Sequence, residues 1–205
     1  MADTAKGRVE VVELSRAQQS AVRRVAEARA TVPAFSVSAE VTGAPLPSLV
    51  RAVAVALRER PDVNGAYRDG RLERYARVNV AVATAGPEGP VTPVVFDADT
   101  KDAGTIADEL DGLGARAAAG GLTAAELAGA TFVLSAVAAR RLEPVLTPGF
   151  AATLGAGAAA ERPAGVDGAL VAASRMDLVL ACDARALSGP AAAAFLARVA
   201  ELLTV

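Results

Sequence analysis

The sequence of 205 residues predicts a single α/β domain in which one mixed β-sheet packs against a layer of helices, a two-layer sandwich. Segments with the period-two pattern of strands, such as residues 35–42, alternate with segments of helical period, such as residues 47–60. A hairpin signal at Asp69-Gly70 and long connections elsewhere interrupt this alternation. The chain does not repeat strand–helix units, so a doubly wound nucleotide-binding fold is not expected.

Elements of the first half are predicted from periodicity and from the residues that begin and end them. Ser15 can cap a helix that ends before Pro33, and Pro47 suits the first turn of the next helix. The expected elements are a short edge strand over 8–12, a helix over 15–29, a strand over 35–42, a helix over 47–60 and a hairpin over 65–75.

The second half contains apolar, β-branched runs that indicate buried strands. A Gly/Pro loop over 86–90 joins the first two of these runs, and Thr123 with Glu126 forms a capping box that opens a short helix. The expected elements are strands over 78–83 and 91–96, a helix over 106–119, a short helix after 123, strands over 131–137, 151–158 and 169–181, and a closing helix over 191–203.

Composition and charge exclude several classes of protein. The 21 basic and 23 acidic residues are interleaved, with a net charge of -2, so nucleic-acid binding is not expected. Neither a signal sequence nor a membrane-spanning run is present, which predicts a cytoplasmic protein that does not bind membranes. With no histidine and one cysteine, the chain offers no metal ligand set. We expect residues 1–7 to be flexible and residues 8–205 to form one domain.

Six short motifs occur along the chain in a fixed order. They are Val32-Pro33-Ala34-Phe35, residues 57–64, Gly89-Pro90-Val91-Thr92-Pro93, Thr131-Phe132-Val133-Leu134-Ser135, Glu161-Arg162-Pro163, and residues 180–189. In this order and spacing they resemble the catalytic domain of the dihydrolipoyl acyltransferases, the core subunits of 2-oxoacid dehydrogenase complexes. The resemblance covers the chain past Arg8 and implies a sandwich of the chloramphenicol acetyltransferase-like type.

The resemblance also implies a chemistry and an assembly. The family transfers acyl groups between thiols, with a histidine as general base and a hydroxyl as hydrogen-bond donor to the oxyanion. It places the base at position 184 and the hydroxyl at Ser135. It implies a homotrimer with the active site between subunits. Coenzyme A is expected as a substrate, with acetyl-CoA as acyl donor and no permanently bound cofactor.

The catalytic loop departs from the family pattern at its central residue. Position 184 is alanine, which cannot accept a proton, and Ser188 replaces a carboxylate that helps to shape the site. Asp183, Arg185 and Gly189 persist around them as loop-shaping residues. Either Ala184 replaces a histidine to trap a bound state, which the intact surroundings favour, or the protein is a natural non-catalytic relative.

Further departures suggest a free-standing enzyme. The connection over 41–49 is shorter than in the family, which should reshape the acceptor side, and neither a lipoyl domain nor an apolar C-terminal extension is present. We therefore expect transfer from a Coenzyme A or carrier-protein thioester to the hydroxyl of a small molecule, by a trimer that builds no large cage. The chain then resembles tetronate acetyltransferases of antibiotic biosynthesis. The alternative is a non-catalytic structural subunit related to dihydrolipoyl acyltransferase cores.

Structural roles compete with these functional interpretations. Ser135 can be a strand-end serine bonded to backbone, and Ser188 can cap the last helix. Asp183 and Arg185 can form an ion pair that shapes the loop.

Two other features could be mistaken for reactive sites. Gly155 and Gly157 indicate close backbone approach within a strand better than a phosphate loop. Cys182 ends an apolar strand without a histidine partner, so we expect a buried side chain and not a nucleophile.

Overall fold

The computed structural model describes residues 3–5, 7–166 and 168–204. Its helices are α1 (Arg16–Thr31), α2 (Leu46–Glu59), the 3-10 helix η1 (Ala98–Thr100), α3 (Ala103–Ala118) and α4 (Gly189–Leu202). Its strands are β1 (Asp3–Thr4), β2 (Gly7–Arg8), β3 (Ala34–Thr42), β4 (Gly65–Arg68), β5 (Arg71–Arg74), β6 (Val80–Val82), β7 (Thr84–Gly86), β8 (Gly89–Val91), β9 (Val94–Val95), β10 (Phe132–Ala136), β11 (Ala152–Ala156), β12 (Ala160–Val166) and β13 (Ala169–Asp183).

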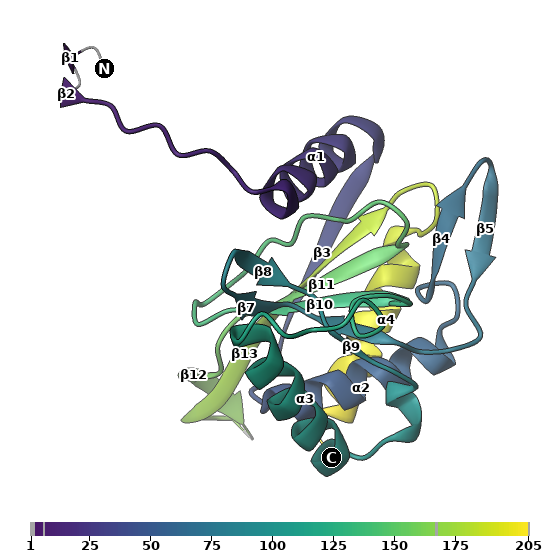
Figure 1. The fold of residues 1–205 in the computed structure, drawn as a ribbon. Coiled ribbons are helices and arrows are strands. Elements are labelled where there is room, and N and C mark those ends of the chain that lie inside the picture. The colour runs from purple at the N-terminus through teal and green to yellow at the C-terminus, as the bar shows by residue number, and fades with distance from the viewer. Residues whose placement is uncertain (1–2, 6, 167, 205) are drawn as a thin grey trace.

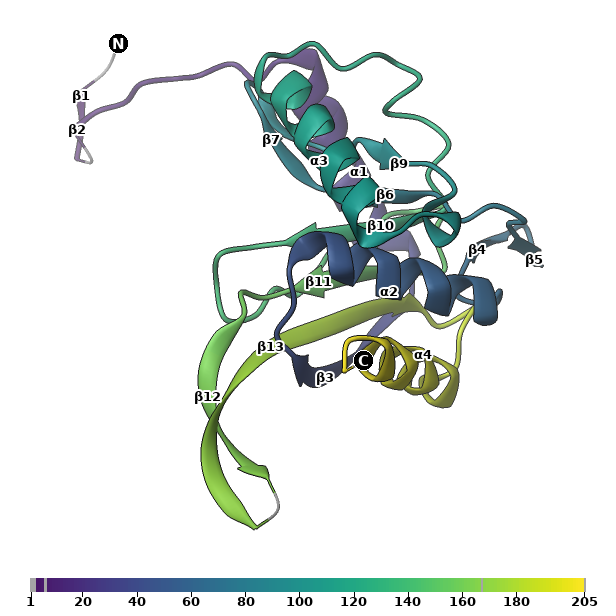
Figure 2. The same cartoon turned by 90° about the horizontal axis from the view of Figure 1, so that it is seen from below.

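The central sheet is mixed, as the sequence predicts. Its seven strands run in the order β12-β13-β11-β10-β6-β9, with β3 on β13. β10 is parallel to both β11 and β6, whereas β13 is antiparallel to β3, β11 and β12. The 15-residue β13 pairs with β12 over its first half and lies between β3 and β11 over its second half. The β12–β13 hairpin therefore projects beyond the rest of the sheet (Figure 2).

Helices α2, α3 and α4 lie on one side of the sheet, and α1 lies on the other (Figure 1). The apolar stripe of α2 is fully buried, and Phe195 of α4 packs on Phe132 of β10 with ring centroids 5.9 Å apart. Alternate residues of the strands, such as Leu134 and Leu180, point into this core. The two-layer α/β prediction is confirmed.

Four details differ from the predicted elements. Residues 9–15 form no strand, and the chain there leaves the body as an extended arm (Figure 1). Thr123 and Glu126 make their capping contacts, with Glu126 N–H donating to Thr123 Oγ1 at 3.3 Å, but they close only a turn. An exposed Leu127 supplies no buried face to extend that turn into a helix. β7–β8 forms a separate hairpin inside the predicted loop, and β12 has no predicted counterpart.

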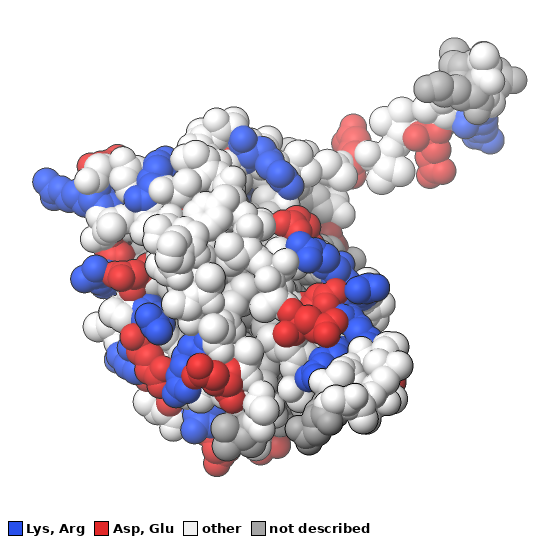
Figure 3. All heavy atoms as spheres, turned by 180° about the vertical axis from the view of Figure 1, so that it is seen from behind, with Lys and Arg blue, Asp and Glu red and all other residues white. Residues whose placement is uncertain are grey.

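Ser15 caps α1 through a complete capping box with Gln18, as its position predicted. Of residues 1–7, which we predicted to be flexible, residues 1, 2 and 6 lie outside the described part, and β1 pairs with β2. Within the described ranges, no helix is both long and apolar enough to cross a membrane. On the face drawn in Figure 3, basic and acidic side chains are interspersed.

Candidate active site

Position 184 lies on a tightly held loop between β13 and α4. The backbone N–H of Ala184 donates to the Pro33 carbonyl at 2.9 Å. The next turn closes on Asp183, whose carbonyl accepts from the N–H groups of Ala186 and Leu187, both at 2.9 Å. The buried Leu187 side chain anchors the turn in the core. The methyl group of Ala184 is exposed, so the structure presents position 184 at the surface on a fixed backbone.

Asp183 and Arg185 form the expected ion pair around this position. The carboxylate is buried and accepts from Arg185 Nε at 2.9 Å and from Nη2 at 2.7 Å, in addition to the Arg185 backbone N–H. The guanidinium also lies over the ring of Tyr67, 4.5 Å from its centroid. The hydrogen bonds that Arg185 donates to the Asp183 carboxylate raise the pKa of Arg185 further above its ordinary value. The pair therefore shapes the loop, in agreement with its predicted structural role.

The β4–β5 hairpin completes the surroundings of the loop. A pocket of about 610 Å³ is lined by Tyr67, Arg68, Asp69, Pro148, Gly149 and Arg185. The sequence predicted the hairpin through Asp69-Gly70 but gave no sign that Tyr67 meets Arg185. Tyr67 and Arg185 are 118 positions apart in the sequence, and the fold brings them into contact. Long-range packing of this kind has no local signal.

Ser135 lies near the end of β10, on the face of the sheet away from α2 and α4. Its neighbour Leu134 points into the core, so Ser135 points to the opposite side. It is half-buried, and its hydroxyl makes no hydrogen bond to any residue that the structure describes. The alternative role, a serine bonded to backbone, is therefore not seen.

The structure does not bring Ser135 and Ala184 together. Ser135 lies in register with Gly155, and Gly155 with Val179, so five positions of β13 separate that row from position 184. At about 3.4 Å per residue and about 4.8 Å per strand, the two positions are about 20 Å apart within one chain. Since hydrogen bonds join atoms about 3 Å apart, the two residues cannot act on one carbonyl from the same copy.

Ser188 and Gly189 begin α4. Ser188 is its N-cap and accepts from the Ala191 N–H at 3.4 Å, which confirms the capping role. Gly189 is the first residue of the helix, and a Cβ added there would meet open space. Both residues therefore serve the helix start beside the loop.

The face that carries Ser135 is partly covered by residues 137–150. A Cβ on Gly155 would lie 2.6 Å from the Leu142 carbonyl oxygen, and a Cβ on Gly157 would overlap the Arg140 carbonyl. The two glycines are therefore sites of close backbone approach, as predicted, and form no phosphate loop.

Cys182 faces the core and is fully buried. Burial raises the pKa of its thiol to about 12, so the thiolate needed by a nucleophile is absent near neutral pH. Among the residues that the structure describes, no group of three or more His, Cys, Asp or Glu is arranged to hold a metal ion.

The short connection between β3 and α2 leaves a small apolar pocket of about 220 Å³. Its walls include Ala44, Leu46 and Leu49 on one side and Ala136 and Met176 on the other. Ala136 directly follows Ser135, so this pocket lies beside the Ser135 end of the sheet.

Comparison with solved structures first defines the class. Chloramphenicol acetyltransferase shares the fold with a TM-score of 0.57 at 18% identity, covering 88% of this chain and 94% of that one. The dihydrolipoamide acetyltransferase of Azotobacter vinelandii is closer, with a TM-score of 0.91 at 26% identity, covering 99% and 95%. The cubic core of the pyruvate dehydrogenase multienzyme complex gives 0.90 at 27% identity, with the same coverage. The fold is that of an acyltransferase of the chloramphenicol acetyltransferase-like type.

Sequence comparison then defines the family. The family model described as "2-oxoacid dehydrogenases acyltransferase (catalytic domain)" matches residues 42–205, and the chain belongs to this family. The lipoamide acyltransferase component of the branched-chain alpha-keto acid dehydrogenase complex from Pseudomonas aeruginosa is 36% identical over 77% of this chain and 38% of its own length. The mitochondrial succinyltransferase component of the 2-oxoglutarate dehydrogenase complex from Saccharomyces cerevisiae is 33% identical over 75% and 34%. The chain thus spans little more than a third of the length of these relatives.

These relatives correct one expectation. A free-standing enzyme that acts on a small-molecule hydroxyl and builds no large cage was expected, and this is wrong: the relatives are components of multienzyme complexes, and one solved relative is a cubic core. The expected likeness to tetronate acetyltransferases has no counterpart among them. Their names refer to branched-chain, succinyl and acetyl groups, so the family is one of acyltransferases and membership in it does not select acetyl.

Proposed function

We propose that this chain is a core subunit of the dihydrolipoyl acyltransferase type whose own catalytic centre lacks its base. The observation that carries the proposal is Ala184, held on an otherwise intact loop between the Asp183–Arg185 ion pair and α4. The loop that should present a base is built, capped and anchored, but its side chain is a methyl group. The role that remains for the chain as it stands is structural, within a core assembly.

The chemistry that position 184 would support follows from its surroundings. A general base there removes the proton of the attacking thiol, and the thiolate sulfur then attacks the thioester carbonyl of an acyl-Coenzyme A. The buried Asp183 carboxylate is fully used by Arg185, so it holds the loop and is not free to replace the base. Ser135 has a free hydroxyl that can donate to the developing oxyanion. In the Azotobacter vinelandii relative, a serine, a histidine and an asparagine have been investigated for their role in the catalytic mechanism.

The geometry favours a centre shared between copies. Since Ser135 and position 184 of one chain are about 20 Å apart, a working centre combines position 184 of one copy with Ser135 of another. A cyclic assembly supplies this pairing at each of its interfaces, because heterologous contacts join unlike surfaces of adjacent copies. We propose a trimer as the unit that does so.

The test is restoration of the base. We expect the wild-type chain to transfer no acyl group from acetyl-Coenzyme A to dihydrolipoamide above background, and Ala184→His to gain about 10²–10⁴-fold in rate. Succinyl- and branched-chain acyl-Coenzyme A are assayed in parallel, because the relatives use these groups.

Ala184→Gln is the matched control, since it adds a polar side chain of similar length that cannot act as a base. Restored transfer in Ala184→His alone supports the proposal. Equal activity in the wild type and Ala184→His, or Ala184→His that folds and assembles but transfers none of the three acyl groups, would overturn it.

A further inference from the structure

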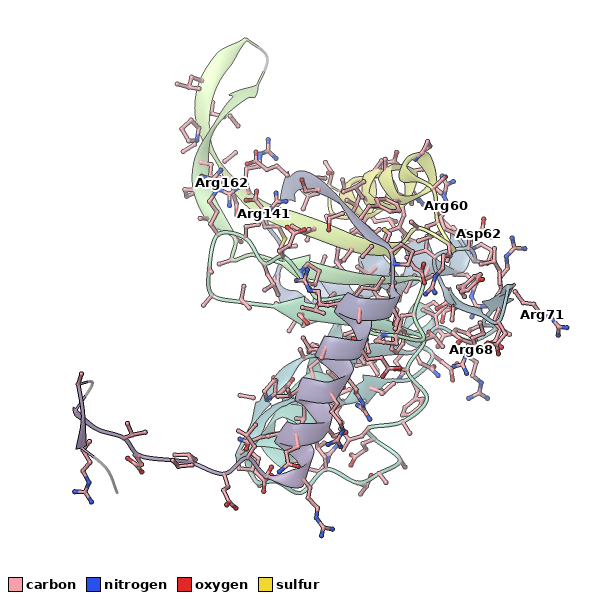
Figure 4. All side chains as sticks on the ribbon, turned by 90° about the horizontal axis from the view of Figure 1, so that it is seen from above. Arg60, Asp62, Arg68, Arg71, Arg141 and Arg162 are labelled. Carbon is pink, nitrogen blue, oxygen red and sulfur yellow. The ribbon has the colours of Figure 1, made fainter. Side chains whose placement is uncertain are left out.

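A pocket of about 300 Å³ lies at the N-terminal end of α1, away from the loop of position 184. The first turns of α1, the β7–β8 hairpin, the end of α3 and the turn after α3 line it. In Figure 4 this end of α1 lies far from the labelled Arg68 of the β4–β5 hairpin. Arg68 lines the pocket beside Arg185, so the two pockets are separate sites.

The walls of the pocket are linked to one another on two sides. Gln18 Nε2 of α1 donates to the Glu88 carbonyl of the hairpin at 3.0 Å. On the other side, the chain at Gly120 approaches the same hairpin so closely that a Cβ there would lie 3.3 Å from Pro87 Cγ. These links hold the hairpin to α1 and to the end of α3, so the pocket is preformed, as ligand pockets usually are.

Short side chains leave the space between these walls empty. Ala21 of α1 and Ala117 of α3 contribute only methyl groups to the lining. Leu127, which is 42% exposed, also lines the pocket, so part of its apolar surface is available to a ligand. An apolar cavity of about 150 Å³ holds one benzene ring, so about 300 Å³ suits a molecule with two fused rings.

The polar groups of the lining select the charge of the ligand. Apart from Gln18 and Glu88, the lining residues are Ala, Gly, Pro, Val and Leu. The Gln18 amide is occupied, because its Oε1 accepts from the Ser15 N–H and its Nε2 donates to the Glu88 carbonyl. The Glu88 carboxylate makes no hydrogen bond or ion pair with any residue that the structure describes. The lining thus offers one unpaired negative charge and no positive charge.

We infer that this pocket binds a small apolar amine, with its ring system between α1 and α3 and its ammonium group at Glu88. Such a ligand has the opposite charge to an acyl-Coenzyme A, whose phosphates a carboxylate would repel. The inference is independent of the proposed function, since it needs neither a base at position 184 nor a centre shared between copies.

A bound molecule would fasten the N-terminal half of α1 to the body of the protein. Most side chains of α1 are exposed, and Ala28 near its C-terminal end is buried. At the other end, the bond from Gln18 to Glu88 joins the helix to the hairpin. A ligand that contacts α1, the hairpin and α3 together should therefore slow amide hydrogen exchange over residues 16–21 and 87–91.

Three indoles that differ in charge test the inference: tryptamine, indole and indole-3-propionate. The chain contains no tryptophan, so the fluorescence anisotropy of each indole reports binding directly. For tryptamine we expect saturable binding with a Kd of about 0.1–1 mM, the range of a ligand of this size. Indole-3-propionate should bind about threefold to tenfold more weakly, because its carboxylate meets Glu88.

Two variants locate the site, each with a matched control. Ala21→Phe fills the pocket and should abolish binding, whereas Ala26→Phe, on the same helix outside the pocket, should bind tryptamine like the wild type. Glu88→Gln should weaken tryptamine about threefold to tenfold and leave indole unchanged. Asp111→Asn, on a part of α3 that does not line the pocket, should change neither.

Several results would overturn the inference. They are the absence of saturable tryptamine binding, binding that Ala21→Phe leaves intact, and binding of indole-3-propionate as tight as that of tryptamine. Slow exchange over residues 87–91 without ligand that Val11→Asp, Val12→Asp accelerates would instead assign the pocket to the N-terminal arm of a second copy.

Discussion

At the scale of single residues, a charged cluster at the Ser135 end of the sheet has clear energetic consequences. Asp177 of β13 is largely buried, and its carboxylate accepts from Arg162 Nη1 at 2.6 Å and from Arg140 Nε at 3.4 Å. Arg162 also donates to the more exposed Glu40 at 2.8 Å. The hydrogen bond from Arg162, above all other influences, lowers the pKa of Asp177. The cluster thereby links β3, β12 and β13 to the segment that covers Gly155.

This cluster predicts a dependence of stability on pH. A carboxyl group whose pKa is lowered in the folded state stabilises the fold above its unfolded pKa of about 3.9, and that stability is lost as pH falls through the folded pKa. We expect Asp177→Asn to lower the free energy of unfolding by about 1–3 kcal/mol at pH 7. The difference from wild type should shrink below about pH 4. Urea unfolding of both proteins at several pH values measures it.

Asp111→Asn serves as the control for this measurement, because Asp111 is exposed on α3 and makes no ion pair with any described residue. Its free energy of unfolding should follow that of the wild type at each pH. A difference between Asp177→Asn and wild type that stays constant down to pH 3 would show that the ion pair contributes nothing to the fold.

Residues with local partners were predictable from the sequence, and residues with distant partners were not. Ser15 and Ser188 cap helices through the third residue that follows each of them, so their roles follow from adjacent sequence. Asp183 and Arg185 are two positions apart and pair as expected. Tyr67 meets Arg185 only because the β4–β5 hairpin folds against the loop, and nothing near Tyr67 in the sequence indicates this.

At the scale of elements, β11 depends on a glycine for the close approach of a neighbouring segment. Gly155 lies in the middle of the sheet, where a side chain would ordinarily favour a strand. A Cβ there would approach the Leu142 carbonyl oxygen to 2.6 Å and Pro144 to 3.0 Å. Backbone groups cannot move aside as a flexible side chain can, so residues 137–150 would have to shift.

We therefore expect Gly155→Ala to lower the free energy of unfolding by about 1–3 kcal/mol through overpacking. Gly165→Ala in β12 is the matched control, because a Cβ there meets nothing within 4 Å and the substitution should be neutral or slightly stabilising. Chemical denaturation of both variants makes the comparison. Equal stability of Gly155→Ala and wild type would mean that the covering segment does not hold its place over β11.

The sequence predicted most elements because their apolar residues repeat with a clear period. β12 escaped prediction because Ala160–Val166 contains Pro163 and mostly small residues, and it pairs only as an edge strand beyond the body of the sheet. The strand expected over 8–12 has the correct alternation, but the described part of the chain places no partner strand beside residues 9–12. A strand needs a neighbour as well as a pattern, and the pattern alone cannot supply one.

At the scale of the whole molecule, an apolar surface remains uncovered on one chain. Val11 and Val12 of the N-terminal arm are 84% and 74% exposed, and Val22 and Val25 of α1 are also exposed, whereas Ala28 is the only residue of that helix that is buried among those whose side chains the structure describes. The arm leaves the body in both Figure 1 and Figure 2. We expect these exposed apolar side chains to be covered by another chain. The arm and α1 thus form the surface on which we expect the proposed trimer to depend.

Val11→Asp, Val12→Asp should therefore shift the protein from a trimer or larger assembly toward the monomer. Burying a valine side chain stabilises an interface by about 1.5 kcal/mol or more, and an aspartate at the same place adds a desolvation cost. The lost binding free energy recurs at every interface of a cyclic assembly. Sedimentation velocity at micromolar concentration measures the change. Ala124→Asp, Ala125→Asp, which adds the same charge at an exposed turn, should sediment like wild type. If the wild type is monomeric, or if the arm variant stays fully assembled, this surface does not hold the copies together. A centre shared between position 184 and Ser135 would then need a different interface.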